Sequence, residues 1–537
     1  MNQSAATAIR AEAPCRDSSA FRGTALRSLL FRIRETLEVI KATTDGAMGL
    51  RLQGDTGDPQ HRVAGVLPPL YPEWLGDRSF QEVHGTRFPY VVGEMADGIA
   101  TTTIVIAAAK AGFLGFFGAA GLGYEYVEQA LTEISRELDG AGLPWGSNLI
   151  HSPAEPLLEE SVADLYIARN VRRVSASAFM ALTPSVVRIA AAGLHLDGAG
   201  RIQRKHYIFA KISRPETAAQ FMAPPPQEML DALVAKGSIT REEARLAARI
   251  PVAEDISVEA DSGGHTDNRP LVCLLPVILE LRDQIAAKYE YDRPIRVGAA
   301  GGIGTPGAAA AAFGMGAAFV MTGSINQSAI EAGTSPAVKA MLAEATVSDV
   351  MMAPAADMFE IGVKVQVLKR GTMFAVRAAQ LYRVYSEYTS LDTIPAALRK
   401  QLESEIFLAP FQEIWDECVR FWQQRDPGQV VKAEKDARHK MALVFRWYLG
   451  KASRWARSGD PKRRLDYQIW CGPAMGAFNA WVKDSFLAAP ANRNVAQIGL
   501  NLLEGAAVIT RAQQARSYGI ALPESAFSFP PRLLSPA

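Results

Sequence analysis

A chain of 537 residues is too long for one ordinary hydrophobic core, since domains average about 150 residues, and 48% hydrophobic with 21% charged residues excludes a disordered or fibrous protein. The net charge of +1 excludes a general attraction to nucleic acid or anionic membranes, so a charged partner would have to meet a local patch. Four cysteines, at positions 15, 273, 418 and 471, show neither CxxC nor metal-ligand spacing, which predicts reduced thiols in a cytoplasm and no metal site.

Residues 1–87 are predicted to form an N-terminal appendage. The first 25 residues contain no apolar core of signal-peptide length, an amphipathic segment follows at 25–42, and the rest is broken by glycine and proline. The most apolar stretches of the chain, 104–121 and 306–323, are rich in alanine and glycine and favour a buried helix and strand over a membrane span. We therefore expect a cytoplasmic protein that does not enter the membrane.

Between residues 88 and 330, short β-type runs alternate with helical patterns, which is typical of βα units around a parallel sheet. Eight strands are expected, at 89–93, 113–118, 145–149, 173–177, 207–211, 256–260, 295–299 and 319–322. Eight parallel strands predict an α/β fold of the closed (β/α)8 TIM-barrel type. An open doubly wound sheet is the alternative.

A helical insertion at 221–253 is predicted between the fifth strand and the sixth. It begins with three prolines at 224–226, and Thr240 with Glu243 forms a capping-box signature before its second helical pattern. An insertion that follows a barrel strand projects over the C-terminal face, where active sites lie, so we expect a lid or a substrate wall. A surface elaboration without chemistry is the alternative.

Glycine-rich turns end the seventh and eighth predicted strands. Gly301 and Gly302 follow the seventh strand, and Gly323 with Ser324 follows the eighth. In a TIM barrel these neighbouring loops form the usual phosphate site, because glycine N–H groups and a helix N-terminus can approach a dianion closely. The glycines between 298 and 304 do not have the GxGxxG spacing of a dinucleotide-binding fold. Tight turns without a ligand are the alternative interpretation.

His265 follows a Ser-Gly-Gly turn at the end of the sixth predicted strand. This position would aim its imidazole into the mouth of the barrel, beside the phosphate loops. Histidine can donate or accept a proton near neutral pH, so His265 is the candidate catalytic residue. A histidine with a purely structural role is the alternative.

Residues 331–537 are predicted to form a mainly helical region that packs on the barrel. Between 432 and 464, eleven Lys or Arg stand against three Asp or Glu, which is either a docking patch for an acidic partner or a solvated helical face. No nucleic-acid reader motif accompanies this stretch, so nucleic-acid binding is not expected. Six aromatic residues in the region are interpreted as core and interface residues rather than ligand-stacking groups: Trp415, Phe421, Trp422, Phe445, Trp447 and Trp455.

Three long motifs resemble the PfaD-type enoyl reductases, which serve polyunsaturated fatty-acid synthases and acyltransferase-less polyketide synthases as separate, trans-acting proteins. The motifs are GEMADGIA at 93–100, EADSGGHTDNRP at 259–270 and AAGGIGTP at 299–306. The resemblance continues through TGSINQ at 322–327 and CGPAMGAFN at 471–479, so it covers most of the chain beyond about residue 65. The barrel is also similar, more distantly, to flavin-dependent bacterial enoyl-ACP reductases and nitronate monooxygenases.

The resemblance implies that FMN lies in the mouth of the barrel. The distant relatives have Gly-Gly-Met after the first strand, whereas this chain has Glu94 in place of the second glycine. Met95 and Ala96 would then touch the isoalloxazine, Asn148 would hydrogen-bond the ring, and Lys211 would compensate negative charge at the flavin or its phosphate. A surface lysine is the alternative for Lys211. The remaining residues implied to surround FMN are Gly264, Gly301, Gly302, Gly323 and Ser324.

The chemistry implied by the resemblance is reduction of an α,β-unsaturated acyl thioester carried by an acyl carrier protein. NADPH or NADH would supply hydride through FMN, and His265 would protonate the α-carbon. The basic stretch at 432–464 would suit an acidic carrier protein. The alternatives are a nitronate monooxygenase-type flavoenzyme and a non-catalytic docking protein of a megasynthase. The oligomeric state is left open, with a homodimer as one alternative.

Overall fold

The computed structural model describes residues 19–55, 58–153 and 155–535. Contacts divide the chain into two compact units, one made of Met1–Trp74 with Leu503–Pro530 and one made of Leu75–Leu502 with Pro531–Ala537. Cys15 and most of the segment predicted to lack signal-peptide character lie outside the described residues. Every residue of the predicted site belongs to the larger unit.

The smaller unit is a four-stranded antiparallel sheet that packs against helices α1 (Gly23–Leu30) and α19 (Val495–Ser517). Its strands pair in the order β1-β3-β2-β4 and are β1 (Ser19–Ala20), β2 (Leu37–Ala42), β3 (Met48–Leu52) and β4 (His61–Leu67). The predicted amphipathic segment at 25–42 is therefore split between a helix and a strand. The buried side chain of Arg511 donates to the carbonyls of Arg32 (2.8 Å) and Glu35 (2.9 Å) between them, a contact that no local pattern contains.

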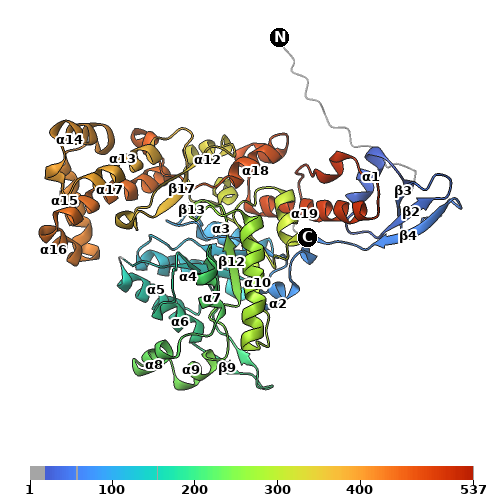
Figure 1. Cartoon of the computed structure of the whole chain (residues 1–537), viewed down its shortest axis with the longest axis horizontal. Helices are drawn as coiled ribbons and strands as arrows, with labels where there is room; N and C mark the ends of the chain where they lie inside the picture. Colours follow the sequence, from blue (N-terminus) through green and yellow to red (C-terminus); the bar gives the residue numbers. More distant parts are fainter. Residues whose placement is uncertain (1–18, 56–57, 154, 536–537) are drawn as a thin grey trace, which may run out of the picture. The chain divides into compact units, whose positions relative to one another are not determined.

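A closed barrel of eight parallel strands forms the larger unit's centre (Figure 1). Each predicted strand is present, and the barrel excludes the open doubly wound alternative. The strands are β5 (Tyr90–Val92), β6 (Leu114–Phe117), β7 (Trp145–Ile150), β8 (Arg173–Ser177), β11 (Tyr207–Ile212), β12 (Asp255–Glu259), β14 (Arg296–Ala300) and β15 (Val320–Thr322). They form because short apolar runs end at glycine or polar turns, and β15 closes the ring against β5, with Val320 opposite Tyr90.

Helices cross from strand to strand on the outside of the barrel. They are α3 (Thr102–Lys110), α4 (Tyr124–Leu138), α5 (Pro156–Ala168), α6 (Pro184–Ala191), α7 (Pro215–Met222), α10 (Leu271–Tyr289) and α11 (Pro306–Gly314). Several begin with proline in the first turn, where its missing N–H breaks no helical hydrogen bond. Among the described residues, no helix combines the length and apolar character needed to cross a bilayer.

The predicted helical insertion consists of α8 (Gln227–Ala235) and α9 (Arg241–Ala247), but it does not form a lid. The chain first completes α7 and returns along the barrel, so the insertion leads into the N-terminal end of β12. Figure 1 shows α8 and α9 at the end of the unit away from β13 (Gly264–His265). The expected position over the C-terminal face is therefore wrong, whereas the capping box between Thr240 and Glu243 is present.

The region after the barrel is mainly helical, as predicted, but it also adds two strands. Strand β17 (Lys364–Leu368) lies between β13 and β16 (Val350–Pro354) in an antiparallel sheet, with His265 opposite Val365. The helices are α12 (Pro336–Ala343), α13 (Phe374–Glu387), α14 (Ala396–Leu402), α15 (Phe411–Arg425), α16 (Pro427–Lys435), α17 (Ala437–Ser458) and α18 (Ala474–Val482). The β13–β17 pairing joins this region to the loop that carries the candidate histidine.

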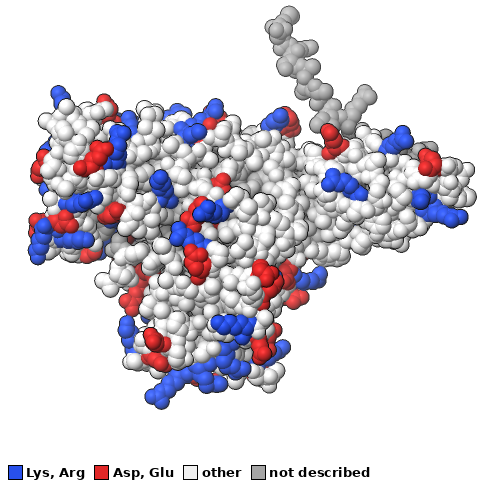
Figure 2. Space-filling model, in the orientation of Figure 1, with Lys and Arg blue, Asp and Glu red and all other residues white. Residues whose placement is uncertain are grey.

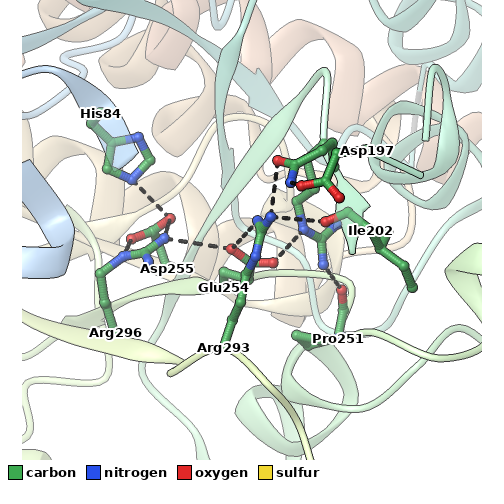
Figure 3. Close-up of polar contacts among 10 residues, drawn as sticks. His84, Asp197, Ile202, Pro251, Glu254, Asp255, Arg293 and Arg296 are labelled. Carbon is green, nitrogen blue, oxygen red and sulfur yellow. Dashed lines mark hydrogen bonds and ion pairs between the residues drawn. The ribbon is translucent and has the colours of Figure 1, made fainter. Parts of the chain in front are cut away.

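The N-terminal end of the barrel is closed by aromatic rings and buried ions. Phe80 from α2 (Arg78–His84) stacks on Phe319 with 4.6 Å between ring centroids. Asp255 accepts two hydrogen bonds from Arg296, at 2.6 and 2.8 Å, and lies 3.0 Å from His84 Nε2, all three side chains being at most 1% exposed (Figure 3). Burial lowers the pKa of His84 despite the neighbouring carboxylate, so this end holds an arginine–aspartate pair beside a neutral imidazole.

Candidate active site

All ten residues predicted for the site line one cavity at the C-terminal ends of the barrel strands. Its volume is about 510 Å³, within the range of about 300–1,000 Å³ typical of small-molecule sites. The ten residues are Met95, Ala96, Asn148, Lys211, Gly264, His265, Gly301, Gly302, Gly323 and Ser324. The structure thus brings together loops that follow β5, β7, β12, β14 and β15, together with the C-terminal part of β11.

The glycine loops after β14 and β15 form a cradle with room beside the backbone. Gly302 has φ +71°, and a Cβ added there or at Gly323 would meet no protein atom within 4 Å. Within the described residues, the backbone N–H groups of Gly302, Ile303 and Gly323 donate no hydrogen bond. Open space beside free backbone donors is what a phosphate group requires, so this cradle fits the phosphate of a flavin.

The segment at 471–479 holds the glycine loops in place. Gly472 donates its N–H to Ser324 Oγ at 3.0 Å, which leaves the hydroxyl proton of Ser324 available to the cavity. A Cβ on Gly263 would lie 2.8 Å from the backbone nitrogen of Cys471, so these two segments of the chain are in backbone-to-backbone contact. The tail motif therefore acts on the site from outside the barrel, through close packing that only glycine permits.

His265 faces an acidic partner that the sequence analysis did not identify. Its Nε2 lies 3.2 Å from Oδ1 of Asp357, which lies in the connection between β16 and β17. Burial alone would lower the pKa of His265, but the hydrogen bond to Asp357 and its charge outweigh burial and raise it. The imidazolium form of His265 is therefore stabilised in the cavity.

A side-chain network fixes the loop that carries His265. Gln366 on β17 donates to Asp261 Oδ1 (2.7 Å) and to the carbonyl of Ser262 (2.7 Å). Asn268 donates to the same Asp261 oxygen and to Gln366 Oε1, both at 2.9 Å. These contacts tie both ends of the loop at 261–268 to β17. The alternation Lys364-Val365-Gln366-Val367 is a strand signal that could have revealed β17.

Lys211 lies between two carboxylates on the wall of the cavity. Its Nζ is 3.3 Å from Glu94 and 3.2 Å from Glu259, and its side chain is 18% exposed, which removes the surface-lysine alternative. Burial lowers the pKa of Lys211, but the charges of Glu259 and Glu94 and their hydrogen bonds outweigh burial and raise it, so the ammonium stays charged. Burial also raises the pKa of Glu259. The carboxylates of Glu94 and Glu259 thus offset the positive charge of Lys211, which was expected to compensate negative charge on a flavin.

Asn148 and Met95 have contrasting environments at the same cavity. Asn148 is 2% exposed and uses its amide group to donate to Ser175 O (2.9 Å) and Ser177 Oγ (2.8 Å), which leaves its carbonyl oxygen as the group that can accept from a ligand. Met95 is 7% exposed, and its carbonyl accepts from Ala100 N at 3.0 Å. Both residues are therefore fixed before any ligand binds.

Helices α15 and α17 form an aromatic wall that the sequence analysis missed. Phe421, Trp422 and Trp447 line the cavity. Trp422 and Trp447 also pack in the helical core, which confirms their interpretation as core residues but adds a contact with the cavity. Trp415 and Phe445 are buried in the helical core as expected, at 9% and 0% exposure. The aromatic residues of the two helices meet at the cavity only in the folded chain. The local sequence pattern therefore could not distinguish residues of the wall from residues of the core.

Four of the eleven basic residues in the stretch at 432–464 form ion pairs within the protein. Arg446 lies 3.2 Å from Glu360, Lys451 3.3 Å from Glu417, and Arg463 3.2 Å from Asp466. Figure 2 shows basic and acidic side chains interspersed over the visible face rather than gathered by sign. A fourth pair joins Arg457 to Asp97 at 3.2 Å, and the other seven basic residues, Lys462 and Arg464 among them, make no ion pair with the described residues, so both interpretations of the stretch stay open.

Two family models match the chain. The nitronate monooxygenase model matches residues 78–409, and the inserted helical domain of [acyl-carrier-protein] S-malonyltransferase matches residues 388–467. The first covers the barrel and more than half of the chain. The second covers α14 to α17, the helices that contribute the aromatic wall. Members of the first family are flavin-dependent oxidoreductases.

Similar proteins come from polyunsaturated fatty-acid and polyketide synthesis. One subunit of the polyunsaturated fatty acid synthase of Thraustochytrium is 46% identical over 82% of this chain, and polyketide biosynthesis protein PksE of Bacillus subtilis is 42% identical over 92%. The chain spans 30% and 63% of their respective lengths.

One solved structure is similar to the chain over nearly its own full length. The enoyl reductase domain of MlnA, from the macrolactin biosynthesis cluster of Bacillus amyloliquefaciens, is 41% identical with a TM-score of 0.78, and the match covers 83% of this chain and 99% of that domain. The two proteins thus share sequence and fold over most of this chain. This chain belongs to the nitronate monooxygenase family and, within it, to the PfaD-type enoyl reductases.

Proposed function

We propose that this protein is a trans-acting enoyl reductase that reduces α,β-unsaturated acyl thioesters carried by an acyl carrier protein, with FMN as cofactor and NADPH or NADH as hydride donor. The observation that carries the proposal is the His265–Asp357 pair, which lies in the same cavity as the glycine cradle. A proton donor and a phosphate cradle in one cavity are the two parts that the protein itself must provide for flavin-dependent reduction.

The assignment of FMN rests on the fit of the residues to its parts. Gly302 and Gly323 would admit the phosphate, and Ser324 would donate its hydroxyl proton to it. Asn148 would accept from the ring through its free carbonyl oxygen, beside Met95 and Ala96. A flavin held there would supply hydride transfer between the nicotinamide and the acyl substrate.

His265 would protonate the α-carbon of the substrate. Because Asp357 engages Nε2 and raises the pKa of the ring, the proton available to the substrate would be held at Nδ1, which has no hydrogen-bond partner among the described residues. Asp357 would act as a positioning residue, since it holds the ring orientation and the protonated state without contacting the acyl chain. Lys211 would hold Glu94 and Glu259 in place rather than face the flavin phosphate.

The substrate class follows from the walls of the cavity. Phe421, Trp422 and Trp447 provide an apolar surface to the cavity, which would suit an acyl chain better than a small nitronate. The relatives from polyunsaturated fatty-acid and polyketide synthesis support a substrate attached to a synthase, and the exposed Lys462 and Arg464 offer a small basic surface to an acidic carrier.

The proposal is tested by anaerobic rapid mixing of the purified, flavin-loaded protein. Reduced nicotinamide should bleach the flavin absorption, and a crotonyl-type carrier thioester should then restore it. Restoration by a nitronate and not by the thioester would favour the nitronate monooxygenase alternative. A colourless preparation that cannot be reconstituted with FMN would overturn the flavin assignment and favour a non-catalytic docking protein.

A further inference from the structure

A second cleft adjoins the cavity. It has a volume of about 450 Å³ and lies between the loops after β5 and β6 and the helices α15 and α17. The two spaces adjoin because they share five lining residues, which are Asp97, Gly121, Leu122, Arg425 and Arg454. A ligand long enough to leave the cavity on this side would therefore enter the cleft directly.

Three arginines line the cleft, and two of them already have carboxylate partners. Arg425 donates to both carboxylate oxygens of Glu155, and Arg457 lies 3.2 Å from Asp97 and also donates to its backbone carbonyl. Each pair is close enough to cancel most of its charge. These two arginines are thus held in fixed orientations at the edge of the cleft.

Arg454 differs from both neighbours. Its side chain is exposed, its guanidinium lies 5.9 Å from the ring centre of Phe421, and it makes no hydrogen bond or ion pair with any described residue. Asp97, the one acidic residue among the described residues that line the cleft, is 8% exposed and is paired with Arg457. One positive charge with five unused N–H donors therefore remains in the cleft.

The wall opposite the arginines is open. A Cβ added to Gly121 or Gly123 would meet no protein atom within 4 Å, and Tyr126 beside them is 56% exposed. On this side the cleft is bounded by backbone and one phenol, and its one carboxylate, that of Asp97, is near enough to act on Arg454 but is paired with Arg457. Such a wall leaves an anion free to approach the guanidinium.

We propose that this cleft binds a phosphate ester through Arg454, with Arg425 and Arg457 at its sides. The inference rests on the proposed function, which calls for two long ligands: a thioester on a phosphopantetheine arm and a reduced nicotinamide dinucleotide. Both carry a phosphate ester far from their reacting atoms. A guanidinium binds such an anion through paired N–H donors, so the phosphate would lie in the cleft while the reacting end lies in the cavity.

The test compares two substrates that differ by the phosphate alone, crotonyl-4′-phosphopantetheine and crotonyl-pantetheine. For Arg454→Gln we expect KM for the phosphorylated thioester to rise about tenfold, the loss of one charge-assisted contact, with KM for the other within about twofold of wild type. Arg438→Gln is the matched control, because Arg438 lies on the same helix, packs 4.7 Å from the ring centre of Tyr385 and lines neither space.

The hydride donor is the second source of a phosphate ester, and the flavin-reduction half-reaction isolates it. If the site serves the donor, Arg454→Gln raises the apparent Kd of NADPH in that half-reaction and leaves both thioesters unchanged, which also supports the proposal. An unchanged KM and Kd throughout overturns it. Equal rises for the two thioesters overturn it as well, because the arginine would then act on something other than phosphate.

Binding without turnover separates this inference from the proposed function. Trp422, Trp447 and Trp470 line the cavity, so binding of 4′-phosphopantetheine and of pantetheine can be followed by tryptophan fluorescence. Tighter binding of the phosphorylated compound that Arg454→Gln abolishes, in a protein with no enoyl turnover, would reject the proposed function and keep the phosphate site. The opposite result would be an active enzyme that binds the two compounds equally and whose Kd for NADPH is unchanged in Arg454→Gln. It would reject the phosphate site and keep the proposed function.

Discussion

The two ends of the barrel hold charged residues in different ways. At the N-terminal end, Asp255 receives hydrogen bonds from Arg296 at 2.6 and 2.8 Å, and both side chains are at most 1% exposed. At the C-terminal end, His265 and Asp357 meet at 3.2 Å with 31% and 44% of their side chains exposed. The first pair is closed to any further partner, whereas the second borders a cavity.

The carboxylates at the two ends show the same contrast. Both oxygens of Asp255 accept hydrogen bonds, but neither oxygen of the buried Glu94 accepts one from the described residues, and Lys211 at 3.3 Å is its ion-pair partner. Buried polar groups are normally satisfied, and each exception calls for an explanation. Glu254 Oε2 at the closed end accepts no hydrogen bond either, so the two ends differ in access and not in satisfaction: Glu94 lines the cavity, whereas Glu254 and Asp255 do not. The difference teaches that charge at the closed end serves stability, whereas charge at the open end is accessible to a ligand.

The largest expected effect is on stability, from Arg296→Met at the closed end. Removing Arg296 leaves Asp255 charged and fully buried with His84, so we expect the free energy of unfolding to fall by about 3–5 kcal/mol in chemical denaturation. Arg293→Met is the matched control, because Arg293 lies 3.8 Å from Glu254 at the exposed edge of the same network (Figure 3). Equal losses of unfolding free energy in the two variants would contradict the contrast between the buried Arg296–Asp255 pair and the more exposed Arg293.

At the open end, His265→Ala should affect chemistry instead of stability. We expect enoyl reduction to fall about 10²–10³-fold, since positioned proton transfer contributes this much, while flavin binding and the free energy of unfolding stay close to wild type. Rapid mixing and chemical denaturation measure the two quantities on one preparation. Unchanged turnover would remove the proton-donor role, and a loss of stability like that of Arg296→Met would make His265 a structural residue.

The barrel could be predicted because each strand is a short apolar run that ends in a turn. The glycines and His265 could be placed for the same reason, since residues at the ends of parallel strands meet at one face. Asp357 and the aromatic wall could not, because Asp357 reaches the cavity through the long-range pairing of β13 with β17, and the wall through packing of α15 and α17. The insertion at 221–253 was assigned to the wrong end, since the pattern did not show that α7 completes its crossing first.

A smaller effect is expected from Gly302→Ala. The new methyl group would project into the cradle, and the left-handed φ of +71° adds strain of about 1–2 kcal/mol. Gly237→Ala carries the same strain, because Gly237 has φ +70° and open space beside it in the α8–α9 connection, away from the cavity. We expect the Kd of FMN, measured by fluorescence titration, to rise about tenfold for Gly302→Ala alone, the equivalent of about 1.4 kcal/mol.

The smallest effect, and the finest test of the open end, is the pH dependence of Asp357→Asn. Asp357 raises the pKa of His265, so its removal lowers that pKa. The acid is the protonated ring, and the rate therefore falls as pH rises through its pKa. The variant should lose activity at a lower pH than wild type, so the ratio of its kcat to that of wild type should fall as pH rises through the pKa of its ring, which a kcat–pH profile of both proteins measures.

Asp392→Asn, at a carboxylate 94% exposed to solvent, should leave the same profile unchanged. A uniform loss for Asp357→Asn at every pH would mean that Asp357 holds the ring's orientation without setting its charge. A profile identical to wild type would mean that the pair plays no part in the reaction, and the open end would then differ from the closed end only in exposure. The shape of the pH profile therefore decides whether the His265–Asp357 pair takes part in proton transfer or has a structural role only.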